Sequence, residues 1–251
     1  MKKVIRIISA AMALALIFSL AACGKSGEKT YVVATDTTFA PFEFTDASGK
    51  FVGIDVDILA AVAEDQGFKY ELKSLGFDAA VAALESNQAD GVIAGMSITD
   101  TRKEKYDFSS AYYDSGVVIA VNGDSATATI DDLKGKTIAV KNGTEGATYA
   151  ESIKDEYGLT LTYFDDSALM YQEVKTGGAA ACVEDYPVMG YGISQGNGLK
   201  MIGDMVQGSS YGFAVMKGKN AELLTKFETG LQNIIKNGKY QEILDKYIAK
   251  A

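Results

Sequence analysis

The 251-residue sequence has no histidine, no tryptophan and only two cysteines. The lack of histidine excludes catalytic triads and metal sites built on imidazole, and it removes the usual general base near neutral pH. Basic residues are also in the minority, and a net charge of −9 argues against nucleic acid as a partner. Cys182 lies in an apolar run and is expected to be a buried strand residue. We therefore expect no metal ion and no other cofactor.

Residues 1–22 have the composition of a signal peptide for export. A basic start is followed by an apolar run that is too short and too rich in alanine for a membrane span. The run ends in Leu20-Ala21-Ala22-Cys23, which resembles the lipobox of bacterial lipoproteins. Lipid on Cys23 would anchor the exported protein to the outer face of the bacterial cell membrane, with residues 23–30 as the tether. The alternative is an ordinary cleaved signal peptide with an incidental cysteine.

Short apolar runs alternate with helical patterns in the rest of the chain, which predicts an α/β fold with mostly parallel sheets flanked by helices. Strands are expected at residues 31–34, 70–72, 91–94, 137–140, 160–163 and 179–183. Helices are expected at about residues 56–66, 79–84, 146–156, 167–175 and 186–194, with two more that carry Leu223 and Leu244. The alternation occurs in two series that extended segments connect.

The two series predict two lobes joined by a hinge. We expect lobe 1 to comprise residues 31–111 plus 212–251, lobe 2 residues 117–208, and a two-strand hinge near residues 112–116 and 209–213. A cleft between two such lobes is the usual place for a ligand, and closure about the hinge is the usual motion.

The stretch from Gly91 to Arg102 is the first indication of a ligand. A buried strand ends at Ala94, and Gly95 would let a ligand approach the backbone closely. Asp100 is expected to cap a helix whose first turn contains Arg102. Backbone N–H groups at a helix start, together with a guanidinium, can bind a carboxylate. The alternative is a strand–turn–helix unit with a surface arginine.

Five segments of the chain, in order and spacing, resemble the binding segments of one protein family. They are Ala34-Thr35-Asp36-Thr37-Thr38-Phe39-Ala40-Pro41-Phe42-Glu43-Phe44, Gly53-Ile54-Asp55-Val56-Asp57-Ile58, Ala94 to Arg102, Val140-Lys141-Asn142-Gly143-Thr144 and Val183-Glu184-Asp185. Together they resemble bacterial extracellular solute-binding proteins of family 3, which bind polar amino acids, and within that family the glutamine-binding members. The resemblance implies the two-lobed type II periplasmic-binding-protein fold.

The resemblance also implies which residues bind the two charges of a free amino acid. Arg102, with the backbone N–H groups of Ser97 and Thr144, would bind the carboxylate, which the fork of a guanidinium suits. Asp185, helped by the carbonyl of Gly95, would bind the ammonium. As an alternative, Asp185 caps the helix that follows it.

The rest of the ligand would meet two aromatic and two charged side chains. Phe39 and Phe77 would flank its aliphatic part and contact the ammonium by cation–π interaction; otherwise they are core aromatics. By the same resemblance Asp36 faces the ligand's side chain; otherwise it is a turn residue at a strand end. Lys141 belongs to a binding segment, with a solvated lysine as the alternative.

Two positions depart from the family pattern and bear on the ligand. Glu184 stands where glutamine-binding members usually have histidine, and Glu145 stands where glycine commonly follows the threonine. An ion pair between Glu184 and Lys141 would leave the pocket neutral, which suits glutamine, whereas an unpaired Glu184 would suit a basic side chain. Lys141 argues against lysine and arginine because like charges repel in a desolvated cleft. We therefore rank L-glutamine first, another neutral polar amino acid second and a basic one third.

The resemblance implies an amino-acid-binding protein, not an enzyme, that delivers its ligand to the membrane permease of an ATP-binding cassette importer, and a monomer is the simplest expectation. One alternative is a surface receptor that senses an amino acid, which the absence of a neighbouring permease gene would indicate. The other is a dehydratase-like enzyme on the same fold, which would need a carboxylate or Lys141 as its acid or base. Turnover of the ligand would identify it.

Overall fold

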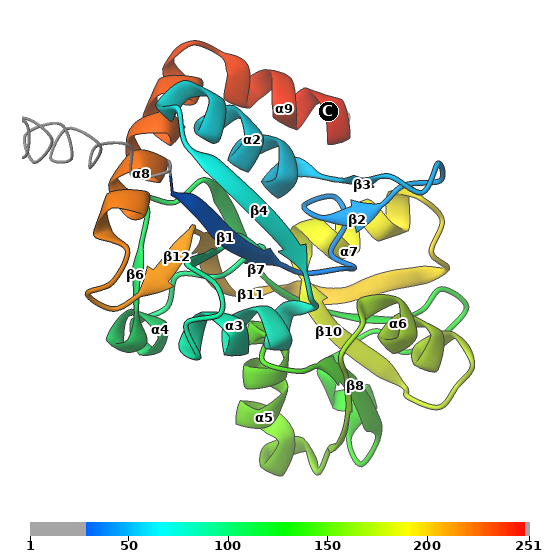
Figure 1. Cartoon of the computed structure of the whole chain (residues 1–251). Helices are drawn as coiled ribbons and strands as arrows, with labels where there is room; N and C mark the ends of the chain where they lie inside the picture. The colour runs from blue at the N-terminus through cyan, green and yellow to red at the C-terminus, as the bar shows by residue number, and fades with distance from the viewer. Residues whose placement is uncertain (1–28, 249–251) are drawn as a thin grey trace, which may run out of the picture. The chain divides into compact units, whose positions relative to one another are not determined.

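The computed structural model describes residues 29–248 (Figure 1). The predicted signal peptide, the lipidation site Cys23 and most of the tether lie outside this range. Within residues 29–248, no helix is both long and apolar enough to cross a membrane.

Lobe 1 is built on a five-stranded sheet in the order β4-β1-β5-β12-β6. Its strands are β1 (Thr30–Thr35), β4 (Lys69–Ser74), β5 (Gly91–Val92), β6 (Tyr106–Phe108) and β12 (Ala214–Met216). β1 and β5 are parallel, whereas β12 is antiparallel to both β5 and β6. The helices are α2 (Ile54–Gln66), α3 (Phe77–Glu85), α4 (Asp100–Lys105), α8 (Ala221–Lys236) and α9 (Lys239–Tyr247), and a hairpin joins β2 (Phe44–Thr45) to β3 (Phe51–Val52).

Lobe 2 contains a second five-stranded sheet, in the order β11-β7-β10-β8-β9. Its strands are β7 (Tyr113–Asn122), β8 (Thr137–Lys141), β9 (Thr160–Phe164), β10 (Ala181–Asp185) and β11 (Leu199–Tyr211). β8 is parallel to both β9 and β10, and β7 is antiparallel to β10 and β11. The helices are α5 (Glu145–Tyr157), α6 (Ser167–Lys175) and α7 (Tyr186–Ser194), with a short 3-10 helix η1 at Ile130–Leu133.

The chain passes between the two sheets twice, from β6 to β7 and from β11 to β12. At these crossings Ser115 pairs with Ser209 and Tyr113 pairs with Tyr211. The segments that the sequence predicted as hinge strands therefore lie side by side. The two-lobed α/β architecture agrees with the prediction, although the crossing strands join each sheet in antiparallel fashion.

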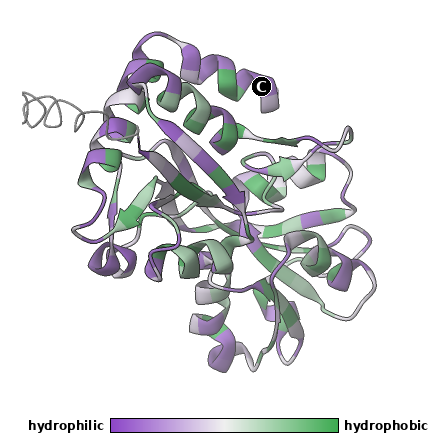
Figure 2. Ribbon diagram, in the orientation of Figure 1, coloured by the Kyte–Doolittle hydropathy of each residue, from purple (hydrophilic) through white to green (hydrophobic). Residues whose placement is uncertain are grey.

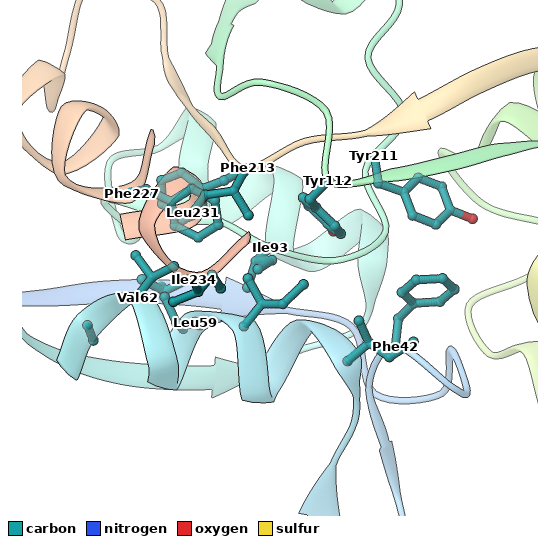
Figure 3. Packing of buried hydrophobic residues seen from close by; sticks show 14 of the residues in the cluster. Phe42, Leu59, Val62, Ile93, Tyr112, Tyr211, Phe213, Phe227, Leu231 and Ile234 are labelled. Carbon is teal, nitrogen blue, oxygen red and sulfur yellow. The ribbon is translucent and has the colours of Figure 1, made fainter. Parts of the chain in front are cut away.

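The core of lobe 1 packs α2 against α8 and continues to the hinge. Phe213 and Phe227 stack with their ring centres 4.3 Å apart, and Leu231 and Ile234 extend the same buried stripe of α8 toward Val62 of α2 (Figure 3). In Figure 2 the central strands are largely hydrophobic, whereas the outer faces of α8 and α9 are hydrophilic. Such amphipathic helices bury one stripe and leave the other face to solvent.

Two local predictions differ from the structure. Thr99, not Asp100, is the N-cap of α4: its side chain accepts a hydrogen bond from the Arg102 backbone N–H at 3.3 Å, and Asp100 is the first helical residue. Arg102 still lies in the first turn. Only the end of the long strand β11, near residues 209–211, was predicted, because the residues of β11 alternate irregularly between buried and exposed and the pairing with β7 contains two register shifts.

Candidate ligand-binding cleft

A small cavity of about 10 Å³, which is room for about one water molecule, lies between the lobes. It is lined by Asp36, Phe39, Phe77, Ala94, Gly95, Ser97, Arg102, Thr144, Glu145 and Asp185. Of the ten residues predicted to bind the ligand, only Lys141 and Glu184 are absent from this lining. The cavity collects the segments that follow β1, β5, β8 and β10, and α3 and α4 face α5 across it (Figure 1).

A larger groove lies between α7 and the end of α9, but it is a poorer candidate for a charged ligand. Its lining is mostly apolar and includes Pro41, Tyr186, Tyr191 and Met205. Among the described residues that line it, Asp114 is the only charged one. A free amino acid brings a charge of each sign, and removing both from water requires partners of both signs. The smaller cavity supplies them.

Arg102 spans the cleft. Its Nη1 donates to the Ser97 carbonyl at 3.0 Å within lobe 1, and its Nη2 donates to the Gly143 carbonyl at 3.0 Å in lobe 2. Nη2 also lies 3.4 Å from a carboxylate oxygen of Glu145, and the guanidinium carbon lies 5.4 Å from the ring centre of Phe77. Burial lowers the pKa of Arg102, and the Glu145 carboxylate opposes this effect. The guanidinium remains charged, as arginine does throughout proteins.

Asp185 is the last residue of β10 and is buried. It occupies the N-cap position of α7, but its side chain makes no capping hydrogen bond, so the alternative capping role is not observed. Instead one carboxylate oxygen accepts a hydrogen bond from the Tyr211 hydroxyl. Burial, followed by repulsion from Glu184, raises the pKa of Asp185 to about 7. A cation at this position would favour the ionised carboxylate.

Lys141 and Asp36 form a buried ion pair across the cleft. The Lys141 ammonium donates to an Asp36 carboxylate oxygen and, at 3.3 Å, to the Ser167 hydroxyl, and it lies 5.4 Å from the ring centre of Phe39. Both charged side chains are only 1% exposed. The alternative of a solvated Lys141 is therefore wrong. Asp36 reaches the cavity and Lys141 lies behind it.

The expected ion pair between Lys141 and Glu184 is not formed, because Lys141 pairs with Asp36 instead. The Glu184 carboxylate accepts hydrogen bonds from the Tyr171 hydroxyl at 2.8 Å and from the Asp185 backbone N–H at 3.0 Å. Burial raises the pKa of Glu184, and the nearby Lys141 opposes this rise. Glu184 is thus satisfied within lobe 2 and does not face the cavity.

Gly95 and the two phenylalanines form the apolar side of the cavity. Gly95 has a φ of 52°, and a Cβ at this position would lie 2.3 Å from a ring carbon of Phe39, so only glycine fits. Phe39 and Phe77 are each 5% exposed, and each lies beneath a cation of the site. Ser97 is also buried, and its carbonyl accepts from Arg102 as described above.

Thr144 is the N-cap of α5. Its hydroxyl accepts from the Ala147 backbone N–H at 3.2 Å and donates to the Lys141 carbonyl at 2.8 Å. The Thr144 backbone N–H is directed at the same carbonyl at 3.4 Å rather than into the cavity. The start of α5 nevertheless borders the cavity, and the positive end of a helix dipole favours an anion there.

Sequence reasoning missed two residues that position this site. Tyr211, which was assigned to the hinge, holds Asp185 as described. Asp55 accepts hydrogen bonds from the Gly95 backbone N–H at 2.7 Å and from the Tyr112 hydroxyl at 2.8 Å. Burial raises the pKa of Asp55 to about 6 and raises the pKa of its buried neighbour Glu43 well above the ordinary value. Asp55 could have been found, because an acidic residue so close to an apolar helical stripe requires a partner.

Known proteins resemble this chain over most of its length. Residues 31–250 match the family model of the bacterial extracellular solute-binding proteins, family 3. The arginine-binding extracellular protein ArtP of Bacillus subtilis is 30% identical, over 94% of this chain and 95% of ArtP. The substrate-binding domain 2 of Lactococcus lactis GlnP, in an open conformation, is 42% identical with a TM-score of 0.60, over 90% of this chain and 98% of that domain. An ancestral arginine-binding protein bound to glutamine is 37% identical with a TM-score of 0.80, over 88% and 98% of the two chains.

Proposed function

We infer, from the premise that the chain belongs to family 3 of the bacterial extracellular solute-binding proteins, that its interlobe cleft captures L-glutamine. The protein is an amino-acid-binding component of an ATP-binding cassette importer and is not an enzyme. We propose which ligand the cleft captures, which residues bind it and which movement encloses it.

The observation that carries this function is the arrangement of charges in one cavity. The Arg102 guanidinium and the buried Asp185 carboxylate both line this cavity. Burial and repulsion from Glu184 raise the pKa of Asp185. In the proposed complex Arg102 binds the α-carboxylate and Asp185 binds the α-ammonium, with the Gly95 carbonyl as a second acceptor. Phe39 and Phe77 enclose the aliphatic part of the ligand.

The Lys141–Asp36 pair supports a neutral amide side chain on the ligand. Only Asp36 of the pair lines the cavity, where its carboxylate is a hydrogen-bond acceptor, and Lys141 behind it leaves the pair with no net charge. A carboxamide offers an N–H donor to such an acceptor and brings no charge of its own. A cationic side chain would gain from Asp36 but would be repelled by Lys141 in a site without water.

A basic ligand is the second candidate. The cavity lining contains three acidic residues, Asp36, Glu145 and Asp185, against the single cation Arg102. The name of the B. subtilis relative also specifies arginine. Arginine binding would mean that the Lys141–Asp36 pair opens to admit a second cation.

We also propose that the two lobes close on the ligand about the crossings at residues 112–116 and 209–213, with lobe 1 comprising residues 31–111 plus 212–251 and lobe 2 residues 117–208. Arg102 and Gly143, and likewise Lys141 and Asp36, touch across the cleft in this structure. The open L. lactis domain has the higher sequence identity but the lower TM-score of the two structures compared above. A difference in lobe orientation between the two structures would give this order.

The proposal extends to the location of the protein. We propose that Cys23 is lipidated, so that the monomeric protein stays at the outer face of the cell membrane beside its permease. Metabolic labelling with a fatty acid should mark the wild-type protein and not the Cys23→Ser variant. Equal labelling of both would contradict the anchor and leave the binding function unaffected.

Calorimetric titration tests the binding function directly. The mature chain, unfolded and refolded to remove bound ligand, would be titrated with glutamine, glutamate, asparagine, arginine, lysine and histidine. We expect tight binding of glutamine that Arg102→Ala and Asp185→Ala each abolish. Tight binding of arginine or lysine alone would keep the charge assignments and overturn the role of Lys141. No binding of any of the six would refute the proposed site.

A further inference from the structure

Glu145 has no role in the binding scheme described above, yet its side chain lines the cavity. It is the first residue of α5, directly after the N-cap Thr144. Its carboxylate lies 3.4 Å from Nη2 of Arg102, and the two side chains are only 17% and 13% exposed. The ion pair is therefore largely removed from solvent and joins lobe 2 to lobe 1.

Arg102 is the only cationic residue among the described residues that line the cavity. Its two terminal nitrogens already donate to the carbonyls of Ser97 and Gly143, and Glu145 supplies a negative charge at the second of them. An incoming α-carboxylate thus meets a guanidinium that a carboxylate of the chain itself has neutralised. Two carboxylates that share one cation repel each other in a site of low polarity.

We propose that Glu145 is an internal competitor for the ligand's carboxylate. In the ligand-free closed cleft its side chain binds Arg102, and it leaves Arg102 when an amino acid binds. This inference rests on the proposed function, because it assigns the competition to the α-carboxylate of the captured ligand. Glu145 thereby weakens capture of the ligand.

The position of Glu145 makes this exchange local. Its backbone is held by the first turn of α5, which Thr144 caps through the Ala147 N–H. Rotatable side-chain bonds connect the Glu145 carboxylate to this backbone, and part of the side chain is already at the surface. A change of rotamer therefore moves the charge into solvent without a change in the fold.

The opposite role for Glu145 predicts the opposite result. If its carboxylate bound the ammonium or a basic side chain of the ligand, removal of the charge would weaken binding. If it only stabilised α5, removal would change the thermal stability and leave the affinity for each ligand unchanged. The sign of the change in affinity therefore separates the three roles.

The test is the dissociation constant of Glu145→Gln, measured by calorimetry with the amino acid of the six-member panel that the wild-type protein binds best. We expect binding roughly three- to tenfold tighter, which corresponds to removing a competing ion pair of modest strength. Asp155→Asn is the matched control, because it removes the same charge from an exposed position of the same helix. It should bind as the wild type does.

An unchanged or weaker affinity of Glu145→Gln would overturn the competition while leaving the binding function in place. Failure of the wild-type protein to bind any amino acid of the panel would instead refute the function itself. Should Glu145→Gln not fold, Glu145→Ala removes the same carboxylate from a helical position that alanine tolerates well, and the same increase in affinity is expected.

Discussion

At the scale of single residues, the site depends on charges that water does not reach. Asp185 is buried with a hydrogen bond from Tyr211, and its pKa is raised to about 7 by burial and by the neighbouring Glu184, while Arg102 opposes the rise. Lys141 and Asp36 neutralise each other within the cleft wall. Each group has a partner that offsets the free-energy cost of its burial. Replacing one partner should therefore raise the cost of burying the other.

Ligand affinity should rise with pH through the titration of Asp185. In the free protein its pKa is about 7, and the proposed complex requires the ionised form, so a proton is lost on binding below about pH 8. Affinity should fall by up to about tenfold for each pH unit below 7 and level off above 8. Titrations at several pH values, in buffers of different ionisation enthalpy, measure both the affinity and the protons released. Wild-type affinity that falls as pH rises would contradict the assignment.

Removing the lysine of the buried pair should destabilise the protein strongly. Lys141→Met leaves the Asp36 carboxylate buried without its cation, which typically costs about 3–5 kcal/mol in free energy of unfolding. Urea denaturation at neutral pH measures the loss, and the double variant Asp36→Asn/Lys141→Met should recover much of it. Lys103→Met is the control, because its pair with Asp100 is exposed. A loss no larger than that of the control would show that the buried pair does not form in solution.

At the scale of elements, some helices and strands bring residues to the cleft, and others pack in the core that supports it. The starts of α4, α5 and α7 bring Arg102, Glu145 and Asp185 to the cleft. By contrast, α8 contributes no residue to the cavity and packs its apolar stripe on α2. Stability and binding are therefore separable by element.

Truncation of a core residue of α8 should lower stability and leave affinity unchanged. Phe227 is fully buried and stacks on Phe213, so Phe227→Ala should cost about 3–5 kcal/mol in free energy of unfolding. Denaturation curves and calorimetric titration, measured below the unfolding transition, check the two halves of this expectation. Ile235→Ala on the same helix, at a residue 43% exposed, should change stability much less. Loss of affinity in folded Phe227→Ala would show that α8 reaches the site.

At the scale of the whole molecule, the two lobes touch through the side chains that line the cleft. Arg102 contacts Gly143 and Glu145, and Asp36 contacts Lys141. A ligand enclosed between the lobes would add contacts to both, so it would bind the folded closed form and not the unfolded chain. Binding and folding stability should therefore be linked.

Saturation with the ligand should raise the thermal stability of the whole protein. At a ligand concentration about 100-fold above Kd, one-site linkage adds about 2.7 kcal/mol, which for a chain of this size corresponds to roughly 5–10 °C in Tm. Differential scanning calorimetry with and without ligand measures the shift. Arg102→Ala should show no shift at the same concentration, and an equal shift in this variant would mean that the ligand binds elsewhere.

The sequence by itself determined the α/β architecture, most of its elements and the segments that line the cleft. Apolar periodicity reveals helices such as α8 and α9, because burial of one face is a local pattern. The binding segments were identified by their resemblance to a protein family, and Asp36 and Ser97 were also expected at strand ends, where ligands of α/β sheets bind. The cap of α4 was misplaced by one residue, because Thr99 and Asp100 are both good N-caps.

Only the tertiary structure decided which charged groups pair. Lys141 binds Asp36, which is 105 positions away in the chain, rather than Glu184, and Arg102 pairs with Glu145 of the other lobe. Asp55 meets the Gly95 backbone in the same way, 40 positions away. A side-chain ion pair or hydrogen bond depends on distances of a few ångströms between segments that folding brings together. The sequence pattern shows that each segment borders the cleft, and the packing of the lobes selects the partner of each charge.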